Sequence, residues 1–172
     1  MRFNRKSKSV FLVDDDPMHN KAMEHNLSSN PFLKIKKFGS GEECLENLNE
    51  NPKIIVLDYH LDSIDKKAMN GIHILKQIKK RKPAITVIML SSQESLSVAK
   101  NSIKYDAYDY IVKGESGMLR ANHLINNIRK QSNTESDLNE YRVYSKLLAG
   151  IVILIITFTL TLNHFYPELF SF

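Results

Sequence analysis

The chain has 172 residues, of which 42% are hydrophobic and 25% charged, with a formal net charge of +5 at pH 7. This is ordinary globular usage, which excludes wholesale disorder and collagen-like repeats. The single cysteine, Cys44, excludes an intrachain disulfide scaffold, and no pair of the six histidines has the spacing of a structural zinc motif.

In chain order, a basic N-terminal segment (1–8) precedes short apolar runs that alternate with stretches of helical spacing. The first run, Val10–Val13, is too short for an export signal, so we expect the charged part of the chain in the cytoplasm. The runs are rich in β-branched or aromatic residues and bounded by turn residues, which predicts strands at 10–13, 33–38, 54–57, 85–90 and 107–112. Helical spacing predicts helices at 18–27, 41–48, 72–78, 96–103 and 119–128. This alternation predicts an α/β domain over 9–130, with a five-stranded parallel sheet and helices on both faces.

The remainder of the chain predicts a polar linker (131–142), a transmembrane helix with its flanks (143–167) and a short C-terminal tail (168–172). Residues 147–163 carry no charge and, as a helix, would extend about 26 Å, close to the hydrocarbon core of a bilayer. A buried helix in a dimer or a coiled coil is the alternative, but the segment is apolar all round, which favours the membrane. Cations precede the segment at Arg142 and Lys146, which predicts a single pass through the inner membrane with the folded domain in the cytoplasm.

Polar side chains follow four of the five predicted strands. They are Asp14, Asp15 and Asp16, then Asp58, then Ser91 and Ser92, and finally Lys113. Because parallel strands end at the same edge of a sheet, these groups should converge there. Clustered carboxylates repel one another and favour a divalent cation, and oxygen ligands suit magnesium or calcium better than zinc. A lysine and a hydroxyl beside such an ion suit a phosphoryl group, and Asp58 is the candidate nucleophile.

The motifs FLVDDDP, IVLDYHL, VIMLSS and DYIVK, in this order and spacing, resemble the receiver domain of two-component response regulators over residues 9–130. The resemblance implies a flavodoxin-like fold with strand order 2-1-3-4-5 and a magnesium-dependent transfer of a phosphoryl group onto Asp58. The donor would be a sensor histidine kinase or a phosphotransfer protein. The implied metal ligands are Asp15 directly, Asp14 mainly through water, Asp58, and the backbone carbonyl of His60. The implied phosphoryl-binding and switch residues are Ser91, Lys113 and the aromatic Tyr110. Turnover would be limited to the domain's own phosphorylation and dephosphorylation, so we expect no other enzyme activity.

Two departures from the family pattern bear on this interpretation. The family usually has a proline with a cis bond after the lysine, where this chain has Gly114, so the following turn should take another path. The family also reaches a glycine about eight residues after the phosphorylated aspartate, whereas Gly71 follows Asp58 by 13. Either change could slow phosphorylation or alter which proteins dock. The carboxylates of this enlarged loop, Asp62 and Asp65, lack the spacing of a calcium-binding loop.

The resulting interpretation is a membrane-tethered receiver that signals through protein contacts with a membrane-bound or other downstream partner. A homodimer is an open option. No helix-turn-helix follows residue 130, and the basic run at 79–82 fits the end of a helix, so we expect no nucleic-acid binding. The alternative is a phosphorylation-independent adaptor that uses the receiver fold for docking and the tail for localisation.

Overall fold

The structure is a computed structural model that describes residues 8–61, 69–92 and 94–165, without the side chains of 132–140 and 161–165. The chain divides into two compact units, residues 1–129 and 130–172, which are described separately.

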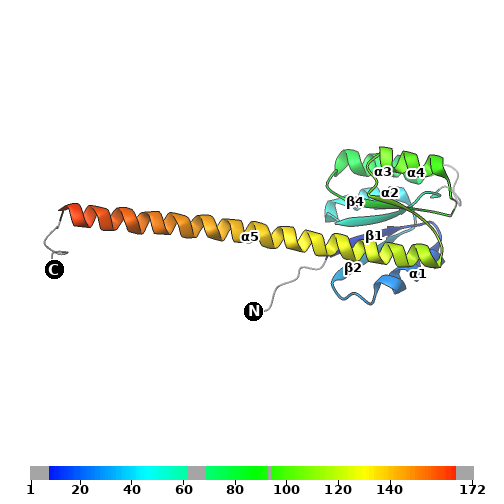
Figure 1. The fold of residues 1–172 in the computed structure, drawn as a ribbon. Coiled ribbons are helices and arrows are strands. Elements are labelled where there is room, and N and C mark those ends of the chain that lie inside the picture. Colours follow the sequence, from blue (N-terminus) through cyan, green and yellow to red (C-terminus); the bar gives the residue numbers. More distant parts are fainter. Residues whose placement is uncertain (1–7, 62–68, 93, 166–172) are drawn as a thin grey trace. The chain divides into compact units, whose positions relative to one another are not determined.

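The first unit is built on a five-stranded parallel sheet (Figure 1). Its strands are β1 (Lys8–Val13), β2 (Leu33–Phe38), β3 (Ile54–Asp58), β4 (Thr86–Ser91) and β5 (Asp109–Val112). They lie in the order β2-β1-β3-β4-β5, which confirms the predicted order. Each β-branched run therefore formed a strand close to its predicted bounds, and β3 occupies the centre of the sheet.

Helices connect the strands in the alternation that the sequence predicts. They are α1 (Pro17–Leu27), α2 (Gly41–Glu46), α3 (Gly71–Arg81), α4 (Leu96–Lys104) and α5 (Glu115–Phe165), with a 3-10 turn, η1 (Leu48–Glu50), after α2. Four begin at a polar N-cap whose side chain accepts a hydrogen bond from the first turn: Asp16, Ser40, Asn70 and Ser95. Helix α2 is shorter than predicted, because its last turn tightens into η1.

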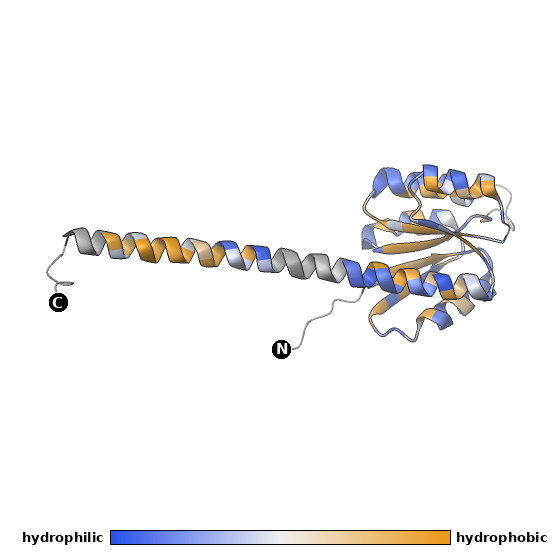
Figure 2. Cartoon of the chain, in the orientation of Figure 1, coloured by the Kyte–Doolittle hydropathy of each residue, from blue (hydrophilic) through white to orange (hydrophobic). Residues whose placement is uncertain are grey.

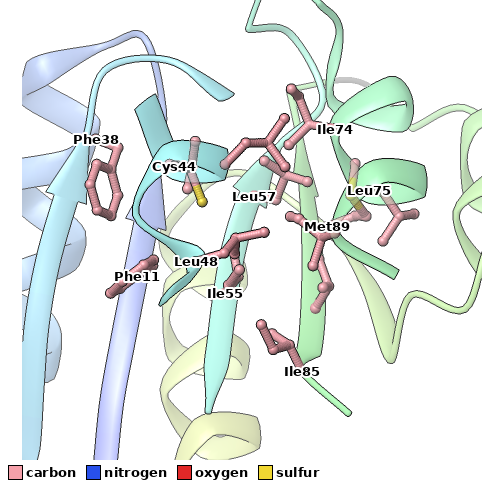
Figure 3. Close-up of a cluster of buried hydrophobic side chains, with 14 of the residues drawn as sticks. Phe11, Phe38, Cys44, Leu48, Ile55, Leu57, Ile74, Leu75, Ile85 and Met89 are labelled. Carbon is pink, nitrogen blue, oxygen red and sulfur yellow. The ribbon is translucent and has the colours of Figure 1, made fainter. Parts of the chain in front are cut away.

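Two hydrophobic cores lie on opposite faces of the sheet because side chains alternate along each strand. Val10 and Leu12 of β1 pack with residues of α1 and α5, whereas Phe11 and Val13 pack with residues of α2 and α3. Figure 3 shows the second of these cores, and Leu57, Ile74 and Cys44 are among its fully buried members. Both cores consist only of residues between 10 and 128, so this unit contains the apolar interior that it needs to fold by itself.

The polar stretch 131–140, expected as a linker, is helical. The predicted fifth helix and the predicted apolar helix are therefore parts of one helix, α5, which continues to Phe165. Within it, Tyr141–Leu160 is long and apolar enough to cross a membrane by length and composition (Figure 2), and none of that described window is buried. The core helix of a soluble protein can match it in length and composition, but such a helix is mostly buried.

Candidate functional site

The site lies at the carboxyl edge of the sheet, where three strands deliver a charged residue each. Asp14 directly follows β1, and its N–H donates to the carbonyl of Phe38 at the end of β2. Asp58 is the last residue of the central strand and lies opposite Leu90 of β4. Lys113 directly follows β5, and its N–H donates to the carbonyl of Ser91, 2.7 Å away. The parallel topology thus brings together residues that are up to 99 positions apart in the chain.

Lys113 bridges the two buried carboxylates. Its Nζ lies 2.8 Å from Oδ2 of Asp14 and 2.8 Å from Oδ2 of Asp58. Both aspartates are buried, with 3% and 2% of their surface exposed. Asp15 is half-buried, and ligand atoms of Asp14, Asp15 and Asp58 lie within 4.8 Å of one another. The predicted acidic cluster with a neighbouring lysine is present.

The two buried carboxylates differ in their proton affinity. Burial raises the pKa of both, but for Asp14 the hydrogen bonds with His19 and Lys113 outweigh burial, and the pKa lies below its ordinary value. For Asp58, burial and the negative charge of Asp14 outweigh Lys113, and the pKa is raised. Burial alone would lower the pKa of Lys113, but its two carboxylate partners raise it. Ionised Asp58 is therefore the group that gains most from a further cation.

The residues present fit a magnesium ion. Oδ1 of Asp58 is buried and has no hydrogen-bond partner among the described residues, which is an unusual state for a carboxylate oxygen. Asp15 and Asp14 supply further oxygen atoms nearby, and an all-oxygen set is the one that magnesium prefers. Asp14, Asp15 and Asp58 are therefore the side chains that could hold the ion.

The remaining predicted site residues lie around this cluster. Ser91 ends β4 and is fully buried, and Tyr110 in β5 is half-buried against the α2–α3 core. His60 follows Asp58 by two positions and is half-buried, with its ring against that of Tyr59. The roles of the Ser91 hydroxyl, the Tyr110 ring and the His60 carbonyl stay predictions.

Two of the polar residues that follow the predicted strands, Asp16 and Ser92, are exposed. Asp16 is exposed and caps α1, because its Oδ1 accepts from the N–H of Met18 at 2.8 Å. Ser92 is exposed. The third carboxylate of the run at 14–16 thus starts the helix and lies outside the cluster.

The two departures from the family pattern have structural answers. Among the described residues no peptide bond is cis, and Gly114 has φ +137°, which proline cannot adopt and other L residues rarely do. The enlarged loop begins and ends at the site: the N–H of Gly71 donates to the carbonyl of Tyr59, 2.9 Å away. The two described ends of the loop are therefore adjacent, and α3 begins beside Asp58. Asp62 and Asp65 lie outside the described residues.

Sequence reasoning missed two neighbours of Asp14 on the first turn of α1. Nδ1 of His19 lies 2.6 Å from Oδ2 of Asp14. Nδ2 of Asn20 donates to the carbonyls of Asp14, at 2.9 Å, and of Phe38, at 3.1 Å. The available signal was the Asp16–Pro17 start of the helix, which places residues 19 and 20 one turn above the end of β1.

The chain is similar to response regulators of known families. Over 105 residues it is 35% identical to a response regulator of Rickettsia conorii described as NtrX-like, covering 60% of this chain and 21% of that protein. It is 31% identical to the DNA-binding transcriptional regulator NtrC of Escherichia coli over 105 residues, again 60% of this chain and 21% of the relative. The match thus spans about a fifth of the length of these relatives.

Solved receiver domains share the fold. The response regulator domain of Thermotoga maritima CheB superposes with a TM-score of 0.60 at 25% identity, covering 74% of this chain and 98% of that one. The receiver domain of NtrX from Brucella abortus gives a TM-score of 0.62 at 23% identity, covering 70% and 98%. The family model of the response regulator receiver domain matches residues 10–128. With the acidic cluster, the bridging lysine and the sheet order in place, the chain belongs to the response regulator receiver family.

Proposed function

We propose that this receiver accepts one phosphoryl group on Asp58 from a sensor histidine kinase or a phosphotransfer protein. The observation that carries the proposal is the state of Asp58: buried, with one oxygen on Lys113 and the other without a partner among the described residues, beside Asp14 and Asp15. Of its two oxygens, one can bind the magnesium ion and the other can form the bond to phosphorus.

In the proposed reaction, a carboxylate oxygen of Asp58 attacks the phosphorus of a phosphohistidine. The O–P bond forms, the P–N bond breaks, and the donor imidazole leaves with its electron pair and takes up a proton. A bound magnesium ion, held by Asp14, Asp15, Asp58 and the carbonyl of His60, would neutralise charge on the phosphoryl oxygens. Lys113 already lies within hydrogen-bond distance of Asp58, so its Nζ would donate a hydrogen bond to one oxygen of the new phosphoryl group. The Ser91 hydroxyl would donate to a second phosphoryl oxygen. We expect no catalysis beyond this self-phosphorylation and the hydrolysis of the aspartyl phosphate, in which water attacks phosphorus and inorganic phosphate leaves the Asp58 carboxylate.

A phosphodonor tests this proposal. Incubation with acetyl phosphate and magnesium should add one phosphoryl group to the wild-type chain and none to Asp58→Asn. Asp16→Asn is the matched control, because asparagine also caps helices and residue 16 lies outside the cluster; it should be labelled like the wild type. Magnesium at ten times its Kd should also stabilise the fold by about 1.4 kcal/mol.

Labelling that persists in Asp58→Asn would refute the assignment of the phosphoacceptor. No labelling of the wild type, together with a melting temperature that magnesium leaves unchanged, would favour the second candidate, a phosphorylation-independent adaptor. Two observations favour that candidate. Lys113 is paired with two carboxylates, and the loop beside the site is enlarged.

We also propose that residues 147–163 anchor the chain in the inner membrane, with the receiver in the cytoplasm and its downstream protein contacts at the membrane. Figure 2 shows the apolar character of this part of α5. The support is that its side chains are exposed, and Leu148, Leu154 and Phe158 are each more than 60% exposed. An exposed helix of this length that is apolar all round needs a lipid or protein environment. Arg142 and Lys146 on its N-terminal side favour the cytoplasmic orientation.

Fractionation separates the membrane from the alternative of a helical dimer. The 172-residue chain should pellet with membranes, resist carbonate washing and require detergent, whereas a protein truncated after Glu140 should be soluble and still accept phosphate. If the untruncated chain is soluble without detergent and elutes as a dimer, the apolar segment is a dimerisation helix and the anchor is wrong.

A further inference from the structure

His19 makes a direct contact with the acidic cluster that the family pattern does not explain. Its Nδ1 lies 2.6 Å from Oδ2 of Asp14, and its side chain is only 17% exposed. The Asp14 carboxylate accepts two more hydrogen bonds. The N–H of Asp16 donates to Oδ1, 2.9 Å away, and Lys113 donates to Oδ2, the oxygen that His19 also contacts. The Asp14 carboxylate is therefore held by three groups at once.

The three donors are not equivalent in the proposed reaction. Lys113 also contacts Asp58 and, in the proposed function, donates to the phosphoryl group once it is attached to Asp58. Asp14 would then keep two hydrogen bonds, from the N–H of Asp16 on Oδ1 and from the imidazole of His19 on Oδ2. Of these two donors, only His19 is a side chain. His19 sits in the first turn of α1, whose start is fixed by the Asp16 cap and Pro17, so its position does not depend on Lys113.

We propose that His19 is a positioning residue of the magnesium site, whose Nδ1–H holds the Asp14 carboxylate in the orientation from which it binds the ion. The inference rests on the proposed function of the site. Hydrogen-bond donors to ligating groups fix the orientation of the ligand, and their removal typically costs 10–100-fold in metal affinity. The low pKa of Asp14 fits this role, because His19 and Lys113 keep the carboxylate ionised.

The test compares magnesium binding to the 172-residue chain in detergent micelles by calorimetric titration. Wild type, His19→Ala, His19→Asn and His25→Ala are the four proteins. His25 lies on the same helix and is exposed, which makes it the matched control. Asparagine places an amide N–H near the position of the imidazole Nδ1, so His19→Asn should restore the hydrogen bond.

The expected result is a Kd for magnesium about tenfold higher in His19→Ala, within about threefold of wild type in His19→Asn, and unchanged in His25→Ala. The phosphorylation rate of His19→Ala should fall at low magnesium and recover at saturating magnesium. A purely structural role for His19 would not give this split between metal affinity and maximal rate.

Three outcomes would overturn the inference. Magnesium affinity of His19→Ala equal to or tighter than wild type would show that the imidazole does not help the site. Equal weakening in His19→Ala and His19→Asn would show that the hydrogen bond is not the cause. If the wild type itself binds no magnesium, the proposed function fails and this inference fails with it. In the first two outcomes the wild type still binds magnesium, so they reject only the inference about His19.

Discussion

Gly71 lies against the backbone of β3 at the start of α3, and its replacement by alanine should damage both stability and the site. A Cβ at this position would lie 2.2 Å from the carbonyl oxygen of Asp58 and 2.7 Å from Cα of Tyr59. Ordinary contact begins at 3.4 Å, so the backbone of β3 or the start of α3 must move by about 1 Å. The neighbours are main-chain atoms, which cannot rotate away.

The cost follows from this geometry. Overpacking that shifts backbone typically costs about 1–3 kcal/mol. Loss of the 2.9 Å hydrogen bond from the N–H of Gly71 to the carbonyl of Tyr59 adds about 1 kcal/mol. The better helix propensity of alanine returns a fraction of this. Gly71→Ala should therefore lower the free energy of unfolding by about 2–3 kcal/mol, and phosphorylation should slow because Asp58 moves with its carbonyl.

Urea unfolding of a protein ending at Glu140 measures the free energy, and acetyl phosphate labelling measures the site. Gly39→Ala is the matched control, since a Cβ there meets nothing within 4 Å; it should be neutral within about 0.5 kcal/mol. If Gly71→Ala is as stable as Gly39→Ala and is labelled at the wild-type rate, the tight return of the loop against Asp58 is wrong.

Two further predictions concern buried titratable groups. At pH 7, Asp58→Asn should raise the free energy of unfolding of the magnesium-free protein, measured in urea, by about 1 kcal/mol, because the raised pKa of Asp58 means that its ionised form disfavours the fold. Asp14→Asn should lower the free energy of unfolding by about 1–3 kcal/mol, because the lowered pKa of Asp14 means that its charge contributes stability above the ordinary pKa of 3.8, lost as the pH falls below it; changes of the same sign in both variants would contradict the opposite shifts. Cys44 should react with Ellman's reagent slowly in the native protein and rapidly in urea, because burial raises its pKa to about 12 and leaves little thiolate near pH 8; rapid native labelling would show that the α2 region opens readily.

The sheet and the main site were predictable because both depend on backbone topology. Short β-branched runs between turn residues mark strands, and parallel strands deliver their ends to one edge. Asp14, Asp58 and Lys113 each follow or end a strand, so their convergence needs no side-chain detail.

The contacts that were missed depend on local geometry that a linear pattern does not encode. Among the three aspartates at 14–16, only the proline that follows Asp16 marks it as the N-cap of α1. His19 contacts Asp14 because of the direction in which its side chain leaves α1, a helix that begins two residues earlier. The spacing from Asp58 to Gly71 indicated a longer loop but not where α3 begins, and the hydrogen bond from the N–H of Gly71 to the carbonyl of Tyr59 places that start beside Asp58.

The helical state of 131–140 is the main difference from the predicted organisation. Its cause can be tested. Serine, asparagine, threonine and aspartate dominate this stretch, and their helix propensities are poor, so an isolated segment would not form a helix. Continuation of an existing helix avoids the cost of nucleation, and here the stretch is flanked by the packed start of α5 and by its apolar part. Amide hydrogen exchange should therefore show slow exchange of 131–140 in the 172-residue chain in micelles, but fast exchange in a protein ending at Glu140, with 119–128 equally slow in both. Equal exchange of 131–140 in the two proteins would show that the apolar part of α5 does not support the polar helix.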